Sequence, residues 1–276
     1  MPKRHRLKLI PKELPLCKGP KLHLFQYHNS HIQWQERLGD DQDDDTSTEG
    51  YVFRVKINDK EYAIKVFKFY NPMSSEYFWG PLLGEDTPLD EAAYYTDPFY
   101  AECRAYGRIN EAIKRKELRP DIVIPCHGFL FLQKRDEKIL NERNVNFELD
   151  KAYLEYQRKS PGGCRARAIV KDLASSETGV NEKSLRKILR DITMLNRQQI
   201  YNMDIRLDNY RDGQIVDFGS SWTEPHSLLN ALDDREAYDS KLADRVMFDQ
   251  MVRDEDIPNP KNILAMHRMT LRSQNV

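Results

Sequence analysis

The sequence predicts an α+β fold, in which a small antiparallel β region containing one helix precedes a mainly helical region. Two β-rich runs, residues 51–57 and 61–69, are separated by Asn58-Asp59-Lys60, which is typical of a hairpin. Apolar residues recur with a helical period over residues 98–113 and again over residues 185–195. The order of these segments places most strands before most helices.

The composition describes a chain of 276 residues with nearly balanced charge, since 43 Lys and Arg face 44 Asp and Glu. Bulk charge therefore does not indicate a nucleic acid or membrane partner. No apolar run is long enough to cross a bilayer, and no signal-peptide pattern is present. The four cysteines lack metal-ligand spacing, so we expect reduced thiols in an intracellular protein of the cytoplasm or nucleus.

Basic residues gather at the start of the chain, where Glu13 is the one acidic residue among seven Lys and Arg within positions 1–24. We treat residues 1–30 as a basic N-terminal arm. Such an arm serves nuclear import or contact with nucleic acid, or it is a solvated terminus. Both interpretations stay open, and no other segment indicates binding of nucleic acid.

The stretch from Asn202 to Gly219 carries the clearest chemical pattern. It contains Asp204, Asn209 five residues later, and Asp217 within Asp-Phe-Gly after a short apolar run. Phosphoryl transfer needs a carboxylate that holds the attacking hydroxyl, and an amide oxygen plus a second carboxylate that hold magnesium. These three residues supply those groups, and Asp212-Gly213 predicts a tight turn before the strand that leads to Asp217.

The same stretch resembles the catalytic loop and metal-binding Asp-Phe-Gly of the protein-kinase superfamily. The resemblance implies that Asp204 is the catalytic base and that Asn209 and Asp217 bind Mg²⁺. It departs from the family pattern where Asn202-Met203 replaces His-Arg, and where Arg206 replaces the catalytic-loop lysine. Arg206 keeps the positive charge without the geometry of a compact ammonium group. The resemblance implies a two-lobed protein-kinase-like fold, and it implies that the protein binds ATP and Mg²⁺.

A lysine and a glutamate complete the expected catalytic set. Alternation along residues 61–69 puts Ala63 and Lys65 on one face, and the resemblance makes Lys65 the lysine that contacts the phosphates. Glu102 borders the apolar stripe of the predicted helix, where an acid needs a buried partner. The resemblance pairs Glu102 with Lys65; the alternatives are a strand lysine that reaches solvent and a surface glutamate paired with an arginine.

The expected nucleotide-binding loop is unusual. In the kinase pattern Gly39 and Gly50 resemble the two ends of a glycine-rich hairpin, and Val52 and Ala63 contact adenine. The acidic tract at residues 40–45 replaces the glycines between them. Carboxylates near a triphosphate repel it unless they face solvent or hold an additional cation, which argues against ordinary use of ATP.

The remaining kinase-like segments set the expected organisation of the chain. The strand near residue 170 leads into Lys171-Asp172-Leu173, which resembles the hinge whose backbone binds adenine. We therefore expect a small lobe at residues 31–173, with insertions near 70–96 and 133–160. A reduced large lobe occupies residues 174–276, where the stretch after Gly219 has room for two or three helices.

Two segments, residues 97–108 and 216–226, are similar to fungal proteins classed with a Sim4-complex kinetochore subunit. Two functions remain open. One is a phosphotransferase that binds nucleotide and acts on an unknown acceptor, with Asp204 as base. The other is a pseudokinase, a nuclear or kinetochore-type module that binds a protein partner without catalysis.

Overall fold

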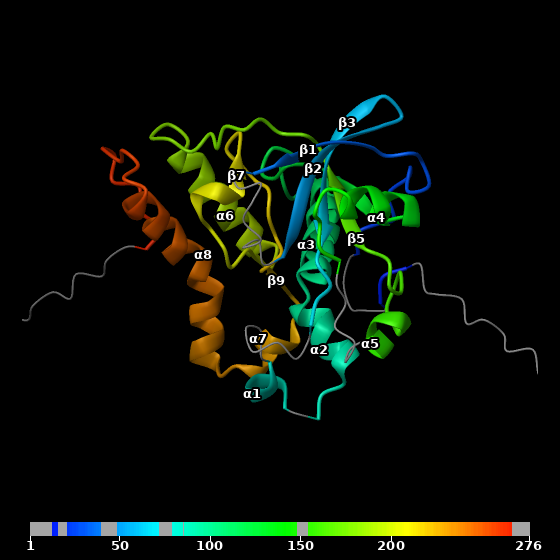
Figure 1. Ribbon diagram of the computed structural model, residues 1–276. Helices are drawn as coiled ribbons and strands as arrows, with labels where there is room; N and C mark the ends of the chain where they lie inside the picture. The colour runs from blue at the N-terminus through cyan, green and yellow to red at the C-terminus, as the bar shows by residue number, and fades with distance from the viewer. Residues whose placement is uncertain are drawn as a thin grey trace, which may run out of the picture.

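A computed structural model describes residues 13–15, 21–39, 49–71, 79–84, 86–147 and 154–266 (Figure 1). The acidic tract at residues 40–45 and much of the basic arm lie outside these ranges.

One antiparallel sheet forms the first half of the fold, and its strand order is β1-β2-β3-β5-β4. The strands are β1 (Gln33–Leu38), β2 (Gly50–Ile57), β3 (Lys60–Phe67), β4 (Cys126–Phe131) and β5 (Arg167–Lys171). Asn58 and Asp59 join β2 to β3 with φ angles of 47° and 62°, as a two-residue hairpin turn requires. The hairpin predicted from the sequence is therefore present.

The long helix α3 (Pro98–Lys114) lies in the chain between β3 and β4. Asp97 caps it by accepting a hydrogen bond from the Phe99 amide at 2.9 Å. At the other end of the helix, the Arg108 guanidinium donates to the carbonyl oxygens of Gln198 (3.2 Å) and Glu224 (2.6 Å). Helix α3 is thus attached to both halves of the chain.

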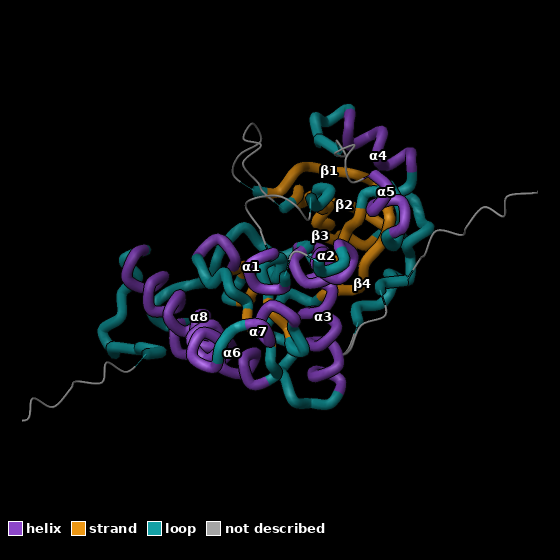
Figure 2. Tube along the Cα trace, turned by 90° about the horizontal axis from the view of Figure 1, so that it is seen from below, coloured by secondary structure: helices purple, strands orange, loops and turns teal. Residues whose placement is uncertain are grey.

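Two apolar cores lie on opposite faces of the sheet. One contains alternate residues of β3, Ile64 and Val66, and is covered by Leu140 of α4 (Lys134–Asn141). The other contains Phe67 and continues through α3 into the helices that follow β5. Figure 2 shows α4 on one side of the strands, and α3 with the remaining long helices on the other.

The second half of the chain is mainly helical. Its helices are α6 (Leu185–Arg197), the 3₁₀ turn η3 (Leu207–Asn209), α7 (Ser227–Ala231) and α8 (Asp234–Asp254). Two short ladders connect them, β6 (Ile200–Tyr201) with β9 (Trp222–Thr223) and β7 (Tyr210–Arg211) with β8 (Gln214–Ile215). The predicted turn at Asp212-Gly213 joins β7 to β8.

The predicted insertions contain more regular structure than their composition indicated. Residues 70–96 include α1 (Gly80–Leu83) and α2 (Leu89–Thr96), and residues 133–160 include α4 and α5 (Leu154–Lys159). Pro88 lies directly before the first helical turn of α2, a position that proline tolerates. Trp79 is buried with Leu228 of α7, so this segment packs on the helical half.

Strand order and the position of α3 confirm the predicted kinase-like arrangement, an antiparallel β lobe with one long helix beside a mainly helical lobe. The exact division of the chain at residue 173 stays a prediction.

The buried pair formed by Asp97 and Arg167 gives a test of this packing. The side chains are 2% and 1% exposed, and Nη1 lies 2.5 Å from Oδ2. Replacement Asp97→Ala removes both the helix cap and the carboxylate that Arg167 contacts. We expect the free energy of unfolding in urea to fall by about 3–5 kcal/mol.

Asp233 provides the matched control, because it caps α8 in the same way but is exposed. Replacement Asp233→Ala should cost about 1 kcal/mol. Equal losses for the two variants would contradict the importance of the buried pair.

Candidate active site

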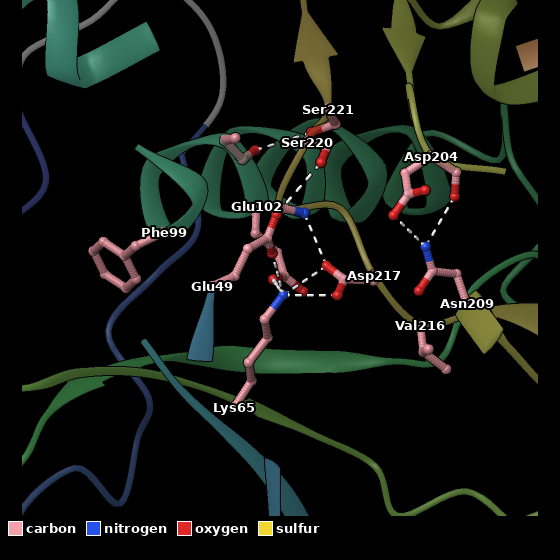
Figure 3. Close-up of polar contacts among 12 residues, drawn as sticks. Glu49, Lys65, Phe99, Glu102, Asp204, Asn209, Val216, Asp217, Ser220 and Ser221 are labelled. Carbon is pink, nitrogen blue, oxygen red and sulfur yellow. Dashed lines mark hydrogen bonds and ion pairs between the residues drawn. The ribbon is translucent and has the colours of Figure 1, made fainter. Parts of the chain in front are cut away.

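The ammonium group of Lys65 lies at the centre of a buried ionic cluster (Figure 3). Its Nζ is 2.7 and 2.8 Å from the two carboxylate oxygens of Asp217. It also lies 3.3 Å from Oε2 of Glu102 on α3, and 2.9 Å from Oε2 of Glu49. Lys65 is only 5% exposed, so the amine itself is shielded from water, whereas the Asp217 side chain is 30% exposed. Residues far apart in the sequence therefore meet at one amine.

The strand register explains why Lys65 points toward α3. Lys65 pairs with Val52 on β2 and with Ile169 on β5, whereas its neighbours Ile64 and Val66 face the opposite core. Residues directly opposite each other on paired strands point to the same face of the sheet, so Val52 shares the face of Lys65. Val52 and Ala63 are both partly exposed.

Lys171 supplies a second buried ammonium group that the sequence analysis assigned differently. We expected Lys171 to begin the hinge and to use its backbone. It is instead the last residue of β5, paired between Ala63 and Cys126. Its Nζ contacts Glu102 and donates to the carbonyl oxygen of Val216 at 2.6 Å. The pattern of residues 167–173 could not show where the strand ends; Leu173 lies beyond it and is partly exposed.

The two lysines determine the charge state of Asp217. Burial opposes its ionisation, but the ammonium groups of Lys65 and Lys171 outweigh burial and hold the pKa of Asp217 well below its usual range. Burial also opposes the charge on Lys65, but Asp217, Glu102 and Glu49 together raise the pKa of that lysine well above its usual range. Lys65 and Asp217 are therefore charged at neutral pH.

Asp204 and Asn209 form a neighbouring pair in the loop that resembles a kinase catalytic loop, residues 202–209. The Nδ2 group of Asn209 donates to the backbone oxygen of Asp204 (2.9 Å) and to its Oδ2 (2.7 Å). The side-chain oxygen of Asn209 consequently points away from Asp204, as Figure 3 shows. Arg206 is exposed, and its Nε lies 3.3 Å from Asp204 Oδ2. The Val216 amide donates to the Asn209 carbonyl at 3.0 Å, which connects this loop to Asp217.

Asp244 anchors the catalytic loop from α8, and the sequence analysis missed it. Its carboxylate accepts hydrogen bonds from the amides of Asn202 (2.9 Å) and Met203 (2.8 Å), and from the Asn196 side chain (2.7 Å). Burial raises the pKa of Asp244, and these hydrogen bonds oppose that shift. The sequence does contain an indication that Asp244 is buried, because it lies four residues before Phe248 on the apolar stripe of α8, where a carboxylate needs hydrogen-bond donors.

Asn202, which stands where the kinase pattern has His, bonds to both sides of the site. Its Nδ2 donates to the carbonyl oxygen of Asp217 at 2.6 Å, and its Oδ1 accepts from the Asp204 amide at 3.1 Å. This one side chain thus links the catalytic loop to the Asp-Phe-Gly segment. Phe218 is fully buried, with its ring against Tyr106 of α3 at a centroid distance of 5.3 Å.

Glu49 is the second residue that the sequence analysis missed. Besides contacting Lys65, its carboxylate lies against Gly219, where an added Cβ would be 1.9 Å from Glu49 Oε2. The acidic tract drew attention to residues 40–45, but the carboxylate that enters the site comes directly before Gly50. Its position beside the predicted phosphate loop was the available signal.

The two glycines expected to flank a phosphate loop have different environments. Gly39 is exposed after β1 with a φ angle of 113°, which favours glycine. Gly50 is buried, and a Cβ there would be 2.3 Å from the Val66 carbonyl oxygen. Close strand packing therefore explains glycine at position 50, and residues 40–48 lie outside the described structure.

The sheet topology, the long helix between β3 and β4, and the contact between Lys65 and Glu102 of that helix define a protein with a kinase-like fold. More specifically, the chain belongs to the family described as kinetochore Sim4 complex subunit FTA2, which matches residues 10–222. This match confirms the resemblance found in the sequence.

Solved structures similar to the chain include vaccinia related kinase 3, at 9% identity and a TM-score of 0.38, over 77% of this chain and 54% of that one. The BubR1 kinase domain matches at 13% identity and a TM-score of 0.40, over 81% and 55% of the respective chains. The chain thus spans about half the length of these two structures. The comparison with curated proteins gives no match. Among the described residues, no helix has both the length and the apolar character needed to cross a membrane.

Replacement Asp244→Asn tests the anchoring of the catalytic loop. The side-chain NH₂ of the new asparagine cannot accept a hydrogen bond, so one of the two backbone amides, of Asn202 or Met203, loses its acceptor. We therefore expect the free energy of protection of these amides, measured by hydrogen exchange, to fall by about 1–3 kcal/mol. Asp249→Asn is the matched control on the same helix, because Asp249 accepts from the amides of Ala265 and Met266. Unchanged protection at residues 202–203 in Asp244→Asn would contradict the anchoring role.

Proposed function

We propose that the chain is a kinase-like phosphotransferase that uses ATP and Mg²⁺. The observation that carries this proposal is the position of Lys65, whose ammonium group contacts Asp217 at 2.7 Å and Glu102 at 3.3 Å. In phosphoryl transfer, such a lysine binds the nucleotide phosphates while the carboxylate of the Asp-Phe-Gly segment holds the metal.

Two side chains fit the requirements of a magnesium site. Asp217 is a charged carboxylate, and Asn209 uses its Nδ2 for Asp204, so its amide oxygen is directed elsewhere. Mg²⁺ prefers a few oxygen ligands from the protein together with substrate phosphates. The described residues contain no group of three or more His, Cys, Asp or Glu arranged around a metal position, so the proposed site depends on a carboxylate and an amide. Bound Mg²⁺ would neutralise charge on the phosphates.

Asp204 is the proposed base. Its side chain is 37% exposed, so an acceptor hydroxyl can reach it, and the Asn209 contact fixes its orientation. As the hydroxyl oxygen forms its bond to the terminal phosphorus, the bond to the leaving ADP oxygen breaks, and Asp204 takes the hydroxyl proton. Arg206 provides a positive charge at the same place. Adenine would lie against Val52, Ala63 and Leu173.

Thermal unfolding with Mg-ATP tests binding. At a nucleotide concentration 100 times Kd, binding should raise the midpoint of the parent protein by about 5 °C or more. Lys65→Met and Asp217→Ala should lose this shift, because each removes a group that holds the phosphates or the metal. Asp204→Asn should keep the shift but lower the rate of ADP formation by about 100-fold or more.

Asp208→Asn is the control for the catalytic loop, because Asp208 is exposed four residues from Asp204. It should retain both binding and turnover. Absence of any Mg-ATP shift in a folded parent protein would contradict the proposed enzyme.

A second candidate function is a pseudokinase that acts as a protein-interaction module of a kinetochore complex in the nucleus. The family description favours it, and so does Glu49, whose carboxylate takes up one side of Lys65. A parent protein that neither binds Mg-ATP nor forms ADP, yet is recovered in a defined complex with kinetochore proteins, would support this function over catalysis.

A further inference from the structure

Glu49 is fixed at the edge of the site by its backbone, while its side chain extends inward. Its carbonyl oxygen accepts a hydrogen bond from the Lys68 amide at 3.0 Å, which continues the pairing of β2 with β3. The side chain is 18% exposed and reaches Lys65 with Oε2 at 2.9 Å. The backbone of Glu49 thus belongs to the edge of the sheet, while its side chain carries the carboxylate to Lys65.

The carboxylate fills a small space between the lysine and the Asp-Phe-Gly segment. Oε1 accepts a hydrogen bond from the Ser220 hydroxyl at 3.4 Å, and in this position of the side chain a Cβ on Gly219 would be 1.9 Å from Oε2 and 2.7 Å from Oε1. Gly219 donates its own amide to Asp217 at 2.9 Å. Glu49 thus places an anion directly beside the proposed metal ligand.

The charges of the cluster make Glu49 the surplus anion. The ammonium groups of Lys65 and Lys171 face three carboxylates, those of Glu49, Glu102 and Asp217. Glu102 contacts both lysines, whereas Glu49 contacts only Lys65 among the described cations. Burial, with repulsion from Asp217 and Glu102, raises the pKa of Glu49 despite the attraction of Lys65. Glu49 is therefore the least favourably placed carboxylate of the three.

We propose that Glu49 is a displaceable latch, whose carboxylate occupies the place on Lys65 that the phosphates of Mg-ATP must take. This proposal rests on the proposed function and adds its regulation. The side chain turns outward when nucleotide binds, and the affinity of the resting protein is reduced by the fraction of time that the latch is closed.

Isothermal titration with Mg-ATP compares the parent with Glu49→Gln, which removes the surplus charge but keeps the side-chain size. We expect Kd to fall at least tenfold in this variant. Glu36→Gln is the matched control, because Glu36 is an exposed glutamate of the same sheet that pairs with Arg54 at 3.1 Å. Its Kd should equal that of the parent.

Acetylation of Lys65 in the nucleotide-free protein, measured by mass spectrometry of its peptide, provides a second readout. The Glu49 carboxylate lies 2.9 Å from the amine and is held there by opposite charge, so the neutral side chain of Glu49→Gln should leave the amine open more of the time and let it react several-fold faster than in the parent. Equal Mg-ATP affinity in the two proteins, or weaker binding by Glu49→Gln, would overturn the latch and leave the proposed function intact. Equal acetylation rates would also overturn the latch. Absence of Mg-ATP binding in every variant would overturn the proposed function and the latch with it.

Discussion

The buried ammonium group of Lys65 is the interaction on which the arrangement of the site depends. It contacts carboxylates from three parts of the chain: Glu49 before β2, Glu102 on α3 and Asp217 after β8. A buried charge is costly unless opposite charges and hydrogen bonds compensate for it, so the fold has to bring these segments together. The ion pairs consequently favour one relative position of the sheet, α3 and the Asp-Phe-Gly segment.

The catalytic loop is held by a separate set of contacts. Asp244 binds two backbone amides of the loop, and Asn202 connects the loop to the carbonyl group of Asp217. These contacts explain how Asn202-Met203 can replace the His-Arg of the kinase pattern while Asp204 and Asn209 stay adjacent. Replacement of the His-Arg residues therefore does not separate Asp204 from Asn209. The site differs from the expected kinase pattern in two further charged groups: Glu49, which contacts Lys65, and Lys171, which contacts Glu102.

The sequence predicted those features that local patterns determine. Strand alternation predicted the face of Lys65, the apolar period of residues 98–113 predicted α3, and a two-residue turn predicted the strand before Asp217. The sequence did not predict that the side chains of Glu49 and Lys171 enter the site. Their contacts join residues 16 or more positions apart, and they depend on where β2 begins and β5 ends. The order of segments indicated the fold, whereas the number of charged side chains that meet at the site depends on the three-dimensional packing of distant segments.

A double-mutant cycle between Lys65 and Asp217 tests the central role of the ammonium group most directly. The free energy of unfolding would be measured in urea for the parent, Lys65→Met, Asp217→Asn and the double variant. Removal of Lys65 leaves surplus negative charge that the second replacement relieves, so the two losses should fall short of additivity by about 1–3 kcal/mol. Losses that add to within about 0.5 kcal/mol would show that the two groups do not interact, and would contradict the account of the site.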